Sequence, residues 1–296
     1  MRVSFFKVRG RPMLRLVVLL GAACFAAAAT AQTQVPGDSR LKSIIAGKTI
    51  RIAYRADARP FSFVNDAKEP LGYTIDLCQQ VANSIAQQFG LAGLKIEWVP
   101  VTVETRFSAV AGGKADLECG SSTVTLGRMK EVDFSILTFV ESTGVLVSRA
   151  SKIQSFGDLA GKAVAVVTGT SNESAIRDLV GKLKLNVTLA PVKDRDEGIA
   201  ALEAGKVAGF ASDKLLLAGA EAKHPEALAI LPDDLSIERY AIVVPRGDWA
   251  LRLAVNTAVA QVFRSGGAKG LFDRWFFGAN PGVLLQALYA LGAIAD

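Results

Sequence analysis

Short β-branched segments alternate with amphipathic segments along this chain, and the alternation occurs in two successive sets. In the first set, residues 49–54 alternate as a strand does, and apolar residues between 75 and 89 recur every three to four positions, as on one face of a helix. Residues 94–100 and 115–119 have strand patterns and flank a short helical segment at 105–111. Alternating strands and helices predict an α/β fold.

The second set begins after Arg149 and predicts a lobe of its own. Its expected strands are 162–168, 187–190 and 207–211, and its expected helices are 174–183, 195–204 and 214–222. Extended apolar segments at 142–148 and 240–245 bracket this set, so we expect two crossings to connect it to a first lobe completed by residues 249–275. With 296 residues, two lobes fit the usual domain size. The predicted division is a signal peptide at 1–31, lobe 1 at 32–142 and 245–280, lobe 2 at 143–244, and a C-terminal apolar extension at 281–296.

The N-terminal segment has the organisation of a secretory signal peptide. An apolar run at 16–29 ends in Ala29-Thr30-Ala31 and is preceded by basic residues without any acidic one: Arg2, Lys7, Arg9, Arg11 and Arg15. The run is too short to span a bilayer comfortably, and its small residues fit cleavage before Gln32. The sequence therefore predicts an exported, periplasmic protein. The apolar tail at 281–294 is also shorter than a spanning helix, so we expect a packed terminal helix there.

Charge and composition exclude several classes of function. The whole chain has a formal charge of +6, but the mature chain retains 29 basic and 28 acidic residues, because the five lost charges belong to the signal peptide. We therefore expect no nucleic-acid partner. A single histidine, His224, and three cysteines leave little for zinc chemistry or a Ser-His relay, so we expect no metal and no cofactor.

A series of short motifs resembles one family of proteins. The motifs are Gly72-Tyr73-Thr74-Ile75-Asp76-Leu77, Asp116-Leu117-Glu118-Cys119-Gly120-Ser121-Ser122-Thr123 with Arg128, Val132-Asp133-Phe134-Ser135, Leu159-Ala160-Gly161-Lys162-Ala163-Val164, Gly169-Thr170-Ser171, Ala208-Gly209-Phe210-Ala211-Ser212-Asp213 and Trp275-Phe276. In this order they resemble the solute-binding proteins of polar amino-acid ABC transporters (family 3), especially the glutamate/aspartate-binding branch. Thr74 departs from the acidic residue usual at that position.

The resemblance implies an α/β, type II periplasmic binding-protein fold, with two lobes joined by a two-strand hinge. It also implies a monomer that closes on glutamate or aspartate and delivers it to a permease in the inner membrane.

An amino-acid ligand needs cationic donors for its carboxylate and an acid for its ammonium group. In the first lobe, Ser121 and Thr123 follow an expected strand, and Arg128 is suited to a bidentate contact. In the second lobe, Thr170 and Ser171 precede a helix whose N-terminal amides favour an anion. These residues are equally expected as turn and N-cap residues, and the resemblance favours binding. Asp213, after an expected strand, is the predicted ammonium acceptor, with helix capping as the alternative.

Three further arginines, Arg55, Arg106 and Arg195, occupy positions that face the cleft in the similar acidic-amino-acid binders. Enclosed guanidinium groups are costly without an anion, so we expect them to stay uncompensated until an acidic ligand enters. For Arg195, which lies between two aspartates, a solvated surface pair is the alternative. Val103 stands where similar proteins can carry a polar residue, so glutamate and aspartate both remain open.

Aromatic residues and cysteines raise two further hypotheses. Phe61, Phe63 and Tyr73 either form an apolar wall beside the ligand or pack in the core. Cys78 and Cys119 each lie beside a first-lobe motif, and export permits a disulfide between them, although the sequence does not give their distance.

The main alternative function is an exported cyclohexadienyl/arogenate dehydratase-like enzyme, which resembles the same two-lobe scaffold. Glu104, Glu118 and Glu173 are its candidate acids or bases, but none has a persuasive partner in the sequence. A sensor domain that passes the ligand state to a receptor would use the same pocket. We favour a binding protein without catalytic residues.

Overall fold

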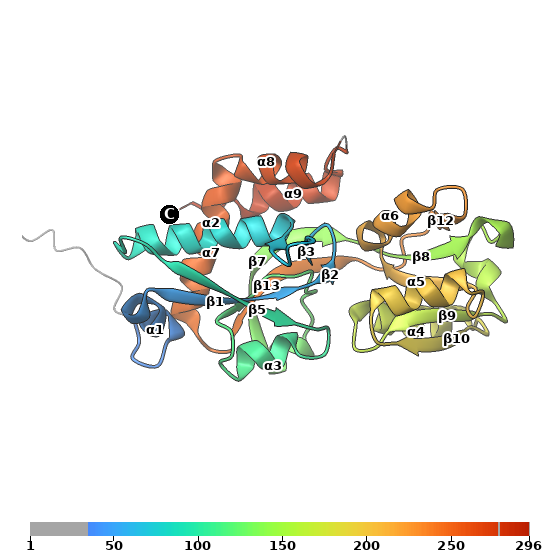
Figure 1. The fold of residues 1–296 in the computed structure, drawn as a ribbon, viewed down its shortest axis with the longest axis horizontal. Coiled ribbons are helices and arrows are strands. Elements are labelled where there is room, and N and C mark those ends of the chain that lie inside the picture. The colour runs from blue at the N-terminus through green and yellow to red at the C-terminus, as the bar shows by residue number, and fades with distance from the viewer. Residues whose placement is uncertain (1–34, 278, 296) are drawn as a thin grey trace, which may run out of the picture. The chain divides into compact units, whose positions relative to one another are not determined.

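The computed structural model describes residues 35–277 and 279–295. The predicted signal peptide lies outside these residues and stays a prediction. The chain from Gly37 onward forms one compact unit that holds two separate five-stranded sheets (Figure 1). Both sheets mix parallel and antiparallel strands and are flanked by helices, which confirms the α/β prediction.

The first sheet is built from both ends of the chain. Its strands, in spatial order, are β5 (Lys95–Val101), β1 (Thr49–Arg55), β6 (Leu117–Glu118), β13 (Glu238–Pro245) and β7 (Val132–Glu141). β1 runs parallel to β5 and β6, whereas β13 runs antiparallel to β6 and β7. Because β1, β5 and β6 are parallel, their carboxyl ends lie at one edge of the sheet, the edge at which ligands gather in open α/β sheets.

Helices cover both faces of this sheet (Figure 1). On one face, α2 (Tyr73–Gln88), α7 (Trp249–Arg264) and α8 (Gly267–Trp275) pack against one another, and on the other, α3 (Arg106–Ala111) contacts β1, β6 and β13. α1 (Arg40–Gly47) contacts β1 and α7. The short 3-10 helix η1 (Arg128–Lys130) precedes β7.

The second sheet follows the same plan. Its strands, in spatial order, are β10 (Thr188–Val192), β9 (Ala163–Val167), β11 (Gly209–Asp213), β8 (Thr143–Ser148) and β12 (Leu228–Ile230). Two apolar clusters cover its two faces: Ile176 of α4 (Ser171–Leu183) belongs to one, and Leu202 of α5 (Arg195–Glu203) with Leu217 of α6 (Lys214–Lys223) belongs to the other. The 3-10 helices η2 (Arg149–Ser151) and η3 (Phe156–Leu159) connect β8 to β9.

The chain crosses between the sheets at two places. It leaves the first sheet at the end of β7 and enters β8 across Ser142, and it returns through β13. Glu141 pairs with Glu238 at one side of this crossing, and Thr143 pairs with Asp213 at the other. The carboxyl end of β6 lies beside β13, and that of β11 lies beside β8. Both ends are therefore near the crossing between the sheets. The numerical lobe boundaries given above stay a prediction.

Several elements differ from the sequence-based expectation. β7 spans ten residues, whereas the sequence analysis identified only the motif at its start and predicted no strand there. A small sheet of β2 (Asp57–Ala58), β3 (Ser62–Val64) and β4 (Pro70–Leu71) lies between β1 and α2, where the sequence pattern predicted no strand. β11 extends to Asp213, two residues beyond the predicted strand. Asp213 therefore lies on the last strand position rather than after it.

The C-terminal apolar segment forms α9 (Val283–Gly292), which packs against α7 and β7. Leu285 is buried, and the Tyr289 hydroxyl lies 3.0 Å from the Tyr73 hydroxyl. The terminal helix is therefore packed, as expected. Within the residues that the structure describes, no helix combines the length and hydropathy needed to cross a bilayer.

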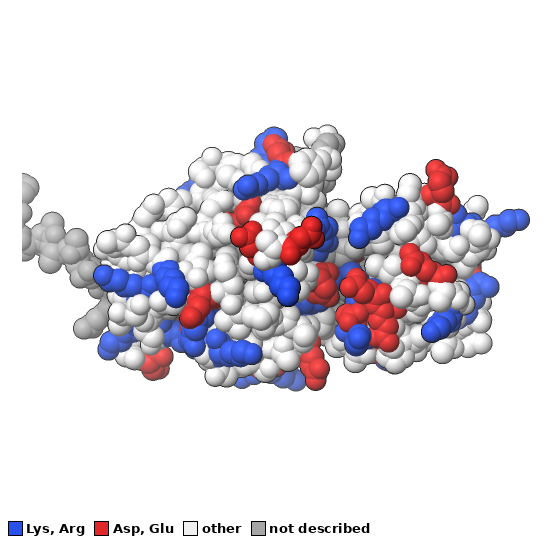
Figure 2. Space-filling view, viewed as in Figure 1, with Lys and Arg blue, Asp and Glu red and all other residues white. Residues whose placement is uncertain are grey.

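Charged side chains of both signs are interspersed on the face drawn in Figure 2. Acidic side chains gather over α5, whose first turn contains Asp196 and Glu197. This mixed distribution offers no extended basic surface on that face.

Candidate functional site

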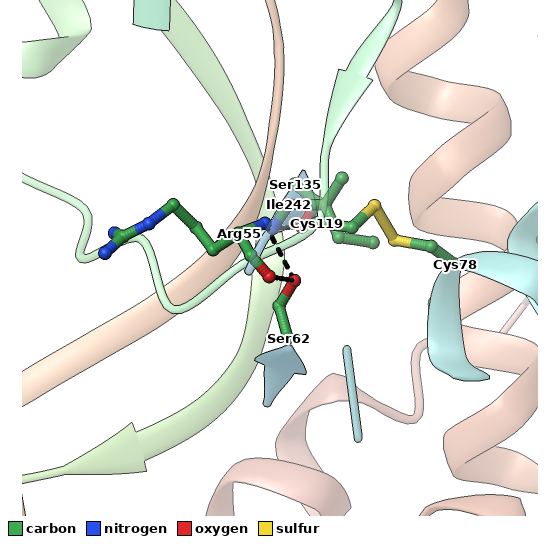
Figure 3. The surroundings of a disulfide bond; sticks show 6 residues. All are labelled: Arg55, Ser62, Cys78, Cys119, Ser135 and Ile242. Atoms are coloured by element: carbon green, nitrogen blue, oxygen red, sulfur yellow. Dashed lines mark hydrogen bonds between the residues drawn. A yellow bond between two sulfur atoms is a disulfide. The ribbon is translucent and has the colours of Figure 1, made fainter. Parts of the chain in front are cut away.

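A disulfide lies beneath the first-sheet side of the site. The sulfur atoms of Cys78, on α2, and Cys119, directly after β6, are 1.98 Å apart (Figure 3). The backbone amide of Cys119 donates to the Ala53 carbonyl of β1. The bond therefore connects α2 to the start of the Gly120–Thr123 loop, which carries predicted ligand groups.

The Ser62 side chain fixes the backbone of Arg55 at the end of β1. The Ser62 hydroxyl accepts from the Arg55 amide and donates to the Arg55 carbonyl, at 2.9 Å in both cases (Figure 3). In Figure 3 the Arg55 side chain extends away from this bond pair and from the disulfide. β3, which carries Ser62, thus sets the direction in which Arg55 leaves the sheet.

One pocket brings together eight of the nine predicted ligand residues, from both sheets. The residues that line it are Arg55, Asp57, Val103, Arg106, Ser121, Arg128, Val167, Thr170, Ser171, Asn172, Arg195, Ser212 and Asp213. Thr123, the ninth, does not line it but hydrogen-bonds to Ser171. The cavity measures about 20 Å³, which is about the space of one water molecule. A ligand of amino-acid size therefore needs the surrounding groups to move apart.

Arg55 and Arg195 share one carboxylate, that of Asp57. Arg55 contacts Asp57 through two parallel hydrogen bonds, Nε to Oδ1 at 2.8 Å and Nη2 to Oδ2 at 2.7 Å. Nη1 of Arg195, the first residue of α5, lies 3.4 Å from Oδ2 and also donates to the Asp57 carbonyl. Burial raises the pKa of Asp57, but the charges of Arg55 and Arg195 outweigh it and hold this pKa below its usual value.

Two sequence-based expectations about these arginines are wrong. Arg195 is only 9% exposed, and its carboxylate partner is Asp57 rather than the adjacent Asp194, which caps α5 by accepting from Glu197 N. The alternative of a solvated surface pair therefore fails. Arg55 and Arg195 also do not wait uncompensated for a ligand, because Asp57 supplies the anion.

Arg106 lies at the start of α3 and is differently placed. It is 4% exposed, its Nη1 donates to the Val103 carbonyl, and its Nε has no hydrogen-bond partner among the described residues. Burial, and then the nearby Arg128, lower the pKa of Arg106 to about 9. Such a group gains from any anion that enters the pocket.

The buried Glu118 lies behind this part of the pocket. It is fully buried, and neither of its carboxylate oxygens has a hydrogen-bond partner within the described residues. Burial raises its pKa, which the charge of Arg106 opposes. A Cβ on Gly120 would lie 2.3 Å from a Glu118 oxygen, so a larger residue at this position would require the Glu118 side chain to shift. Glu118 and Gly120 thus shape the loop that presents Ser121.

Arg128 spans the two sheets. Its Nη1 donates to the Thr123 carbonyl at 2.7 Å, and its Nη2 lies 3.4 Å from the Gly169 carbonyl, which precedes α4. Burial lowers the pKa of Arg128, while Glu238 and Glu118 oppose that effect. Its hydrogen-bond acceptors are two neutral carbonyls, so its charge is available to a carboxylate ligand.

The hydroxyl groups of Thr123 and Ser171 meet at Glu238, a residue that the sequence analysis missed. Thr123 Oγ1 donates to Glu238 Oε2 at 2.6 Å, and Ser171 Oγ lies 2.7 Å from the same oxygen. Glu238 begins β13 and also accepts from Ser236 and Thr143. The two predicted carboxylate donors therefore have an acidic partner at the crossing between the sheets.

Thr170 has a defined structural role. It is the N-cap of α4: its hydroxyl accepts from the Glu173 amide and donates to the Val167 carbonyl. This matches the capping alternative, and the first two residues of α4, Ser171 and Asn172, line the pocket beside it.

Asp213 differs from Thr170. It occupies the N-cap position of α6 but its side chain makes no capping bond; instead, Oδ1 accepts from Asn172 Nδ2 at 3.0 Å. Burial, and then the neighbouring Glu238, raise the pKa of Asp213 to about 6. An ammonium group next to Asp213 would lower that pKa again and thereby gain binding free energy.

The hypothesis of an aromatic wall beside the ligand is wrong. Phe61 and Tyr73 are fully buried and pack edge-on, with ring centroids 6.1 Å apart, in a cluster that includes Phe139 and Phe276. None of the three predicted wall residues lines the pocket. They form the core beneath the first sheet.

Two α/β sheets connected by two crossings, with a pocket whose charged residues come from both, define a two-lobed ligand-binding protein. The chain belongs to the bacterial extracellular solute-binding proteins, family 3, which it matches over residues 50–278.

Curated relatives cover most of the chain. One is the L-glutamate/L-aspartate-binding protein of Pseudomonas aeruginosa, 33% identical over 239 residues, or 80% of this chain and 79% of that protein. Another is the glutamate/aspartate import solute-binding protein of Escherichia coli, 30% identical over 266 residues, or 89% and 87% of the two chains.

Solved structures give the same fold. An ancestral arginine-binding protein bound to arginine is 26% identical, with a TM-score of 0.70, and the match covers 77% of this chain and 98% of the other. An ancestral amino acid-binding protein, a precursor of cyclohexadienyl dehydratase, is 28% identical, with a TM-score of 0.71 and coverage of 80% and 100%. These matches confirm the type II periplasmic binding-protein fold.

Proposed function

We propose that the mature chain binds glutamate or aspartate in the periplasm and delivers it to an ABC-transporter permease in the inner membrane. The observation that carries this proposal is the convergence of four arginines, from both lobes, on one pocket: Arg55, Arg106, Arg128 and Arg195. The two glutamate/aspartate-binding relatives support the same ligand class. The signal peptide at 1–31 would direct export.

In this proposal the ligand backbone is held at one end of the pocket. Arg128 and Ser121 receive the α-carboxylate, together with the backbone amides at the N-terminus of α4 and the hydroxyl groups of Thr123 and Ser171. Asp213 receives the ammonium group. Without ligand, the hydroxyl groups of Thr123 and Ser171 donate to Glu238, which keeps them oriented. When the ligand binds, they donate to its α-carboxylate in place of part of that contact.

Arg106 is the main partner of the ligand's side-chain carboxylate. It lacks a carboxylate hydrogen-bond partner among the described residues, and a neutral ligand side chain would leave its buried charge uncompensated. Arg55 and Arg195 also donate to this carboxylate once Asp57 moves aside.

Closure of two lobes is the transport mechanism that we propose. Lobe 1 comprises residues 32–142 and 245–280, and lobe 2 comprises 143–244. A ligand that contacts Arg128 in one lobe and Asp213 in the other favours the closed form, because only that form provides both contacts. A monomer suffices for this mechanism, and the permease then recognises the paired lobe surfaces.

A dehydratase-like enzyme is the second candidate, because one similar structure is a precursor of cyclohexadienyl dehydratase. None of its three candidate acids lines the pocket as the structure describes it: Glu104 is exposed, Glu118 lies behind the loop, and Glu173 accepts from Gly169 and Arg177. Binding without turnover is therefore the better supported function.

Thermal-shift screening of the mature protein tests the proposal. Each common amino acid and prephenate are added in turn, since a ligand of the native state raises the unfolding temperature. We expect the largest increase with glutamate or aspartate. An increase with prephenate, accompanied by its consumption, would favour the enzyme instead.

A further inference from the structure

Asp57 holds an unusual position for a binding pocket that takes acidic ligands. Its carboxylate lines the pocket and makes the paired contact to Arg55 that a ligand carboxylate would make. The same carboxylate contacts Arg195, the first residue of α5, which packs against the second sheet. An anion that belongs to the protein therefore covers two of the four arginines.

The pocket has too little space for Asp57 and a ligand carboxylate to contact Arg55 at the same time. With Asp57 in place, the cavity measures only about 20 Å³. Arg55 Nε and Nη2 both point at Asp57, and the Arg55 side chain is only 5% exposed, so its forked edge has no second open approach. A ligand carboxylate and the Asp57 carboxylate cannot occupy this edge together, since like charges in contact repel strongly.

The two contacts of Asp57 differ in their dependence on lobe closure. Arg55 ends β1, and Asp57 begins β2 two residues later, so this pair stays together when the lobes separate. The Arg195 contact joins β2 to α5, which packs against the second sheet, and exists only while the two lobes are close. Asp57 can therefore act on a ligand at its first encounter with the open lobe, before Arg195 takes part.

We propose that Asp57 is a specificity-determining residue that competes with the ligand's side-chain carboxylate for Arg55 and Arg195. This inference rests on the proposed function of the pocket. Asp57 lowers the affinity for acidic amino acids, because each such ligand must first displace it. Neutral ligands do not require Arg55, so Asp57 also narrows the difference in affinity between acidic and neutral amino acids.

Asp57→Asn tests this inference, because it removes the charge and keeps the size of the side chain. Isothermal titration of the mature protein with glutamate, aspartate and glutamine is the measurement. We expect about tenfold tighter binding of both acids and a change of less than about threefold for glutamine. Asp57→Glu, which keeps the charge, should bind both acids more weakly than Asp57→Asn.

Two controls separate competition from a general effect on folding. Asp116→Asn removes a similar paired contact, to Arg51 in the same sheet but outside the pocket, and should leave the affinities unchanged. In an Arg55→Ala background, Asp57→Asn should lose most of its benefit, since Asp57 and the ligand no longer compete for that guanidinium.

Three outcomes are distinguishable. Tighter binding of the acids by Asp57→Asn supports the inference, even if the wild type gives little heat. Acid binding by the wild type that is unchanged or weaker in Asp57→Asn overturns it and leaves the proposed function standing. If neither protein binds glutamate or aspartate, the proposed function fails and the inference fails with it.

Discussion

The two ends of the pocket compensate their guanidinium groups in different ways. At one end, Arg55 and Arg195 share the carboxylate of Asp57, which lies within the pocket. At the other, Arg106 and Arg128 donate to neutral carbonyls, and the buried Glu118 acts on them only through its charge. The first end is neutralised by a direct partner, whereas the second retains donors for an incoming carboxylate.

This difference suggests an order of events. The open lobe first attracts a carboxylate through Arg128 and Arg106, because their hydrogen bonds to carbonyls are weaker than contacts with an anion. Only then does the ligand gain enough contact to displace Asp57 from Arg55. Substitutions at the second end should therefore affect binding most.

Arg128→Ala should give the largest effect. Removing a charged hydrogen-bonding partner of a buried ligand group should weaken binding of every amino acid by about 100-fold or more. Titration calorimetry on the mature protein measures it. Arg149→Ala is the matched control, because Arg149 also donates to a backbone carbonyl, that of Pro225, away from the pocket. Near-normal affinities in Arg128→Ala would contradict the assigned role.

Arg106→Ala should have a smaller and selective effect. We expect glutamate and aspartate to bind about 10- to 100-fold more weakly, and glutamine to change by less than about threefold, because only an acidic side chain needs this guanidinium. Arg40→Ala is the control for lost stability, since Arg40 donates to the carbonyl of Ala115, two residues before β6 and outside the pocket. Equal losses for all three ligands would refute the division of roles between Arg106 and Arg128.

The pH dependence of binding should be moderate. Asp213 has a pKa of about 6, which burial and then Glu238 raise, and only its ionised form attracts an ammonium group. Its ionised fraction falls as the pH falls through this value, so the affinity should be about tenfold lower at pH 5 than at pH 7. Asp213→Asn should bind weakly, with little pH dependence over this range. If the affinity of the wild type does not change between pH 5 and pH 7, Asp213 does not bind the ligand's ammonium group.

Loss of the disulfide should affect the affinity least. Replacing both Cys78 and Cys119 by serine should reduce the free energy of unfolding by about 2–4 kcal/mol, whereas the affinity should change by less than about threefold. The reason is that the bond holds only the residue before the Gly120–Thr123 loop and contacts none of the predicted ligand-binding side chains. Urea unfolding and calorimetry measure the two effects. Thiol labelling of the denatured, unreduced wild type checks the bond: two reactive sulfurs would show that it is absent.

The alternating pattern of the sequence predicted most of the fold because each buried strand and each helix face has its own period. β1 and α4 follow such patterns and were expected close to their observed bounds. β7 was missed because its burial does not alternate regularly and its pairing with β13 is interrupted by register shifts. The strands of the small sheet are too short to carry a period.

The candidate site was only partly predictable. Residues next to motifs, such as Ser121 and Arg128, were found because the resemblance placed them in order. Asp57 and Glu238 were missed, since their roles depend on partners that only the fold brings near: Arg195 is 138 residues from Asp57, and Thr123 is 115 from Glu238. An acid two residues from Arg55 was a usable signal, because it offered a local anion to a residue that was expected to lack one.

The most direct test of the central claim is a calorimetric titration of the mature protein with four amino acids in parallel. If Arg106 and Arg128 keep their charges available to an acidic amino acid, glutamate or aspartate should give saturable heat, while lysine and leucine give none. Saturable heat with lysine or leucine, and no signal with either glutamate or aspartate, would contradict the account.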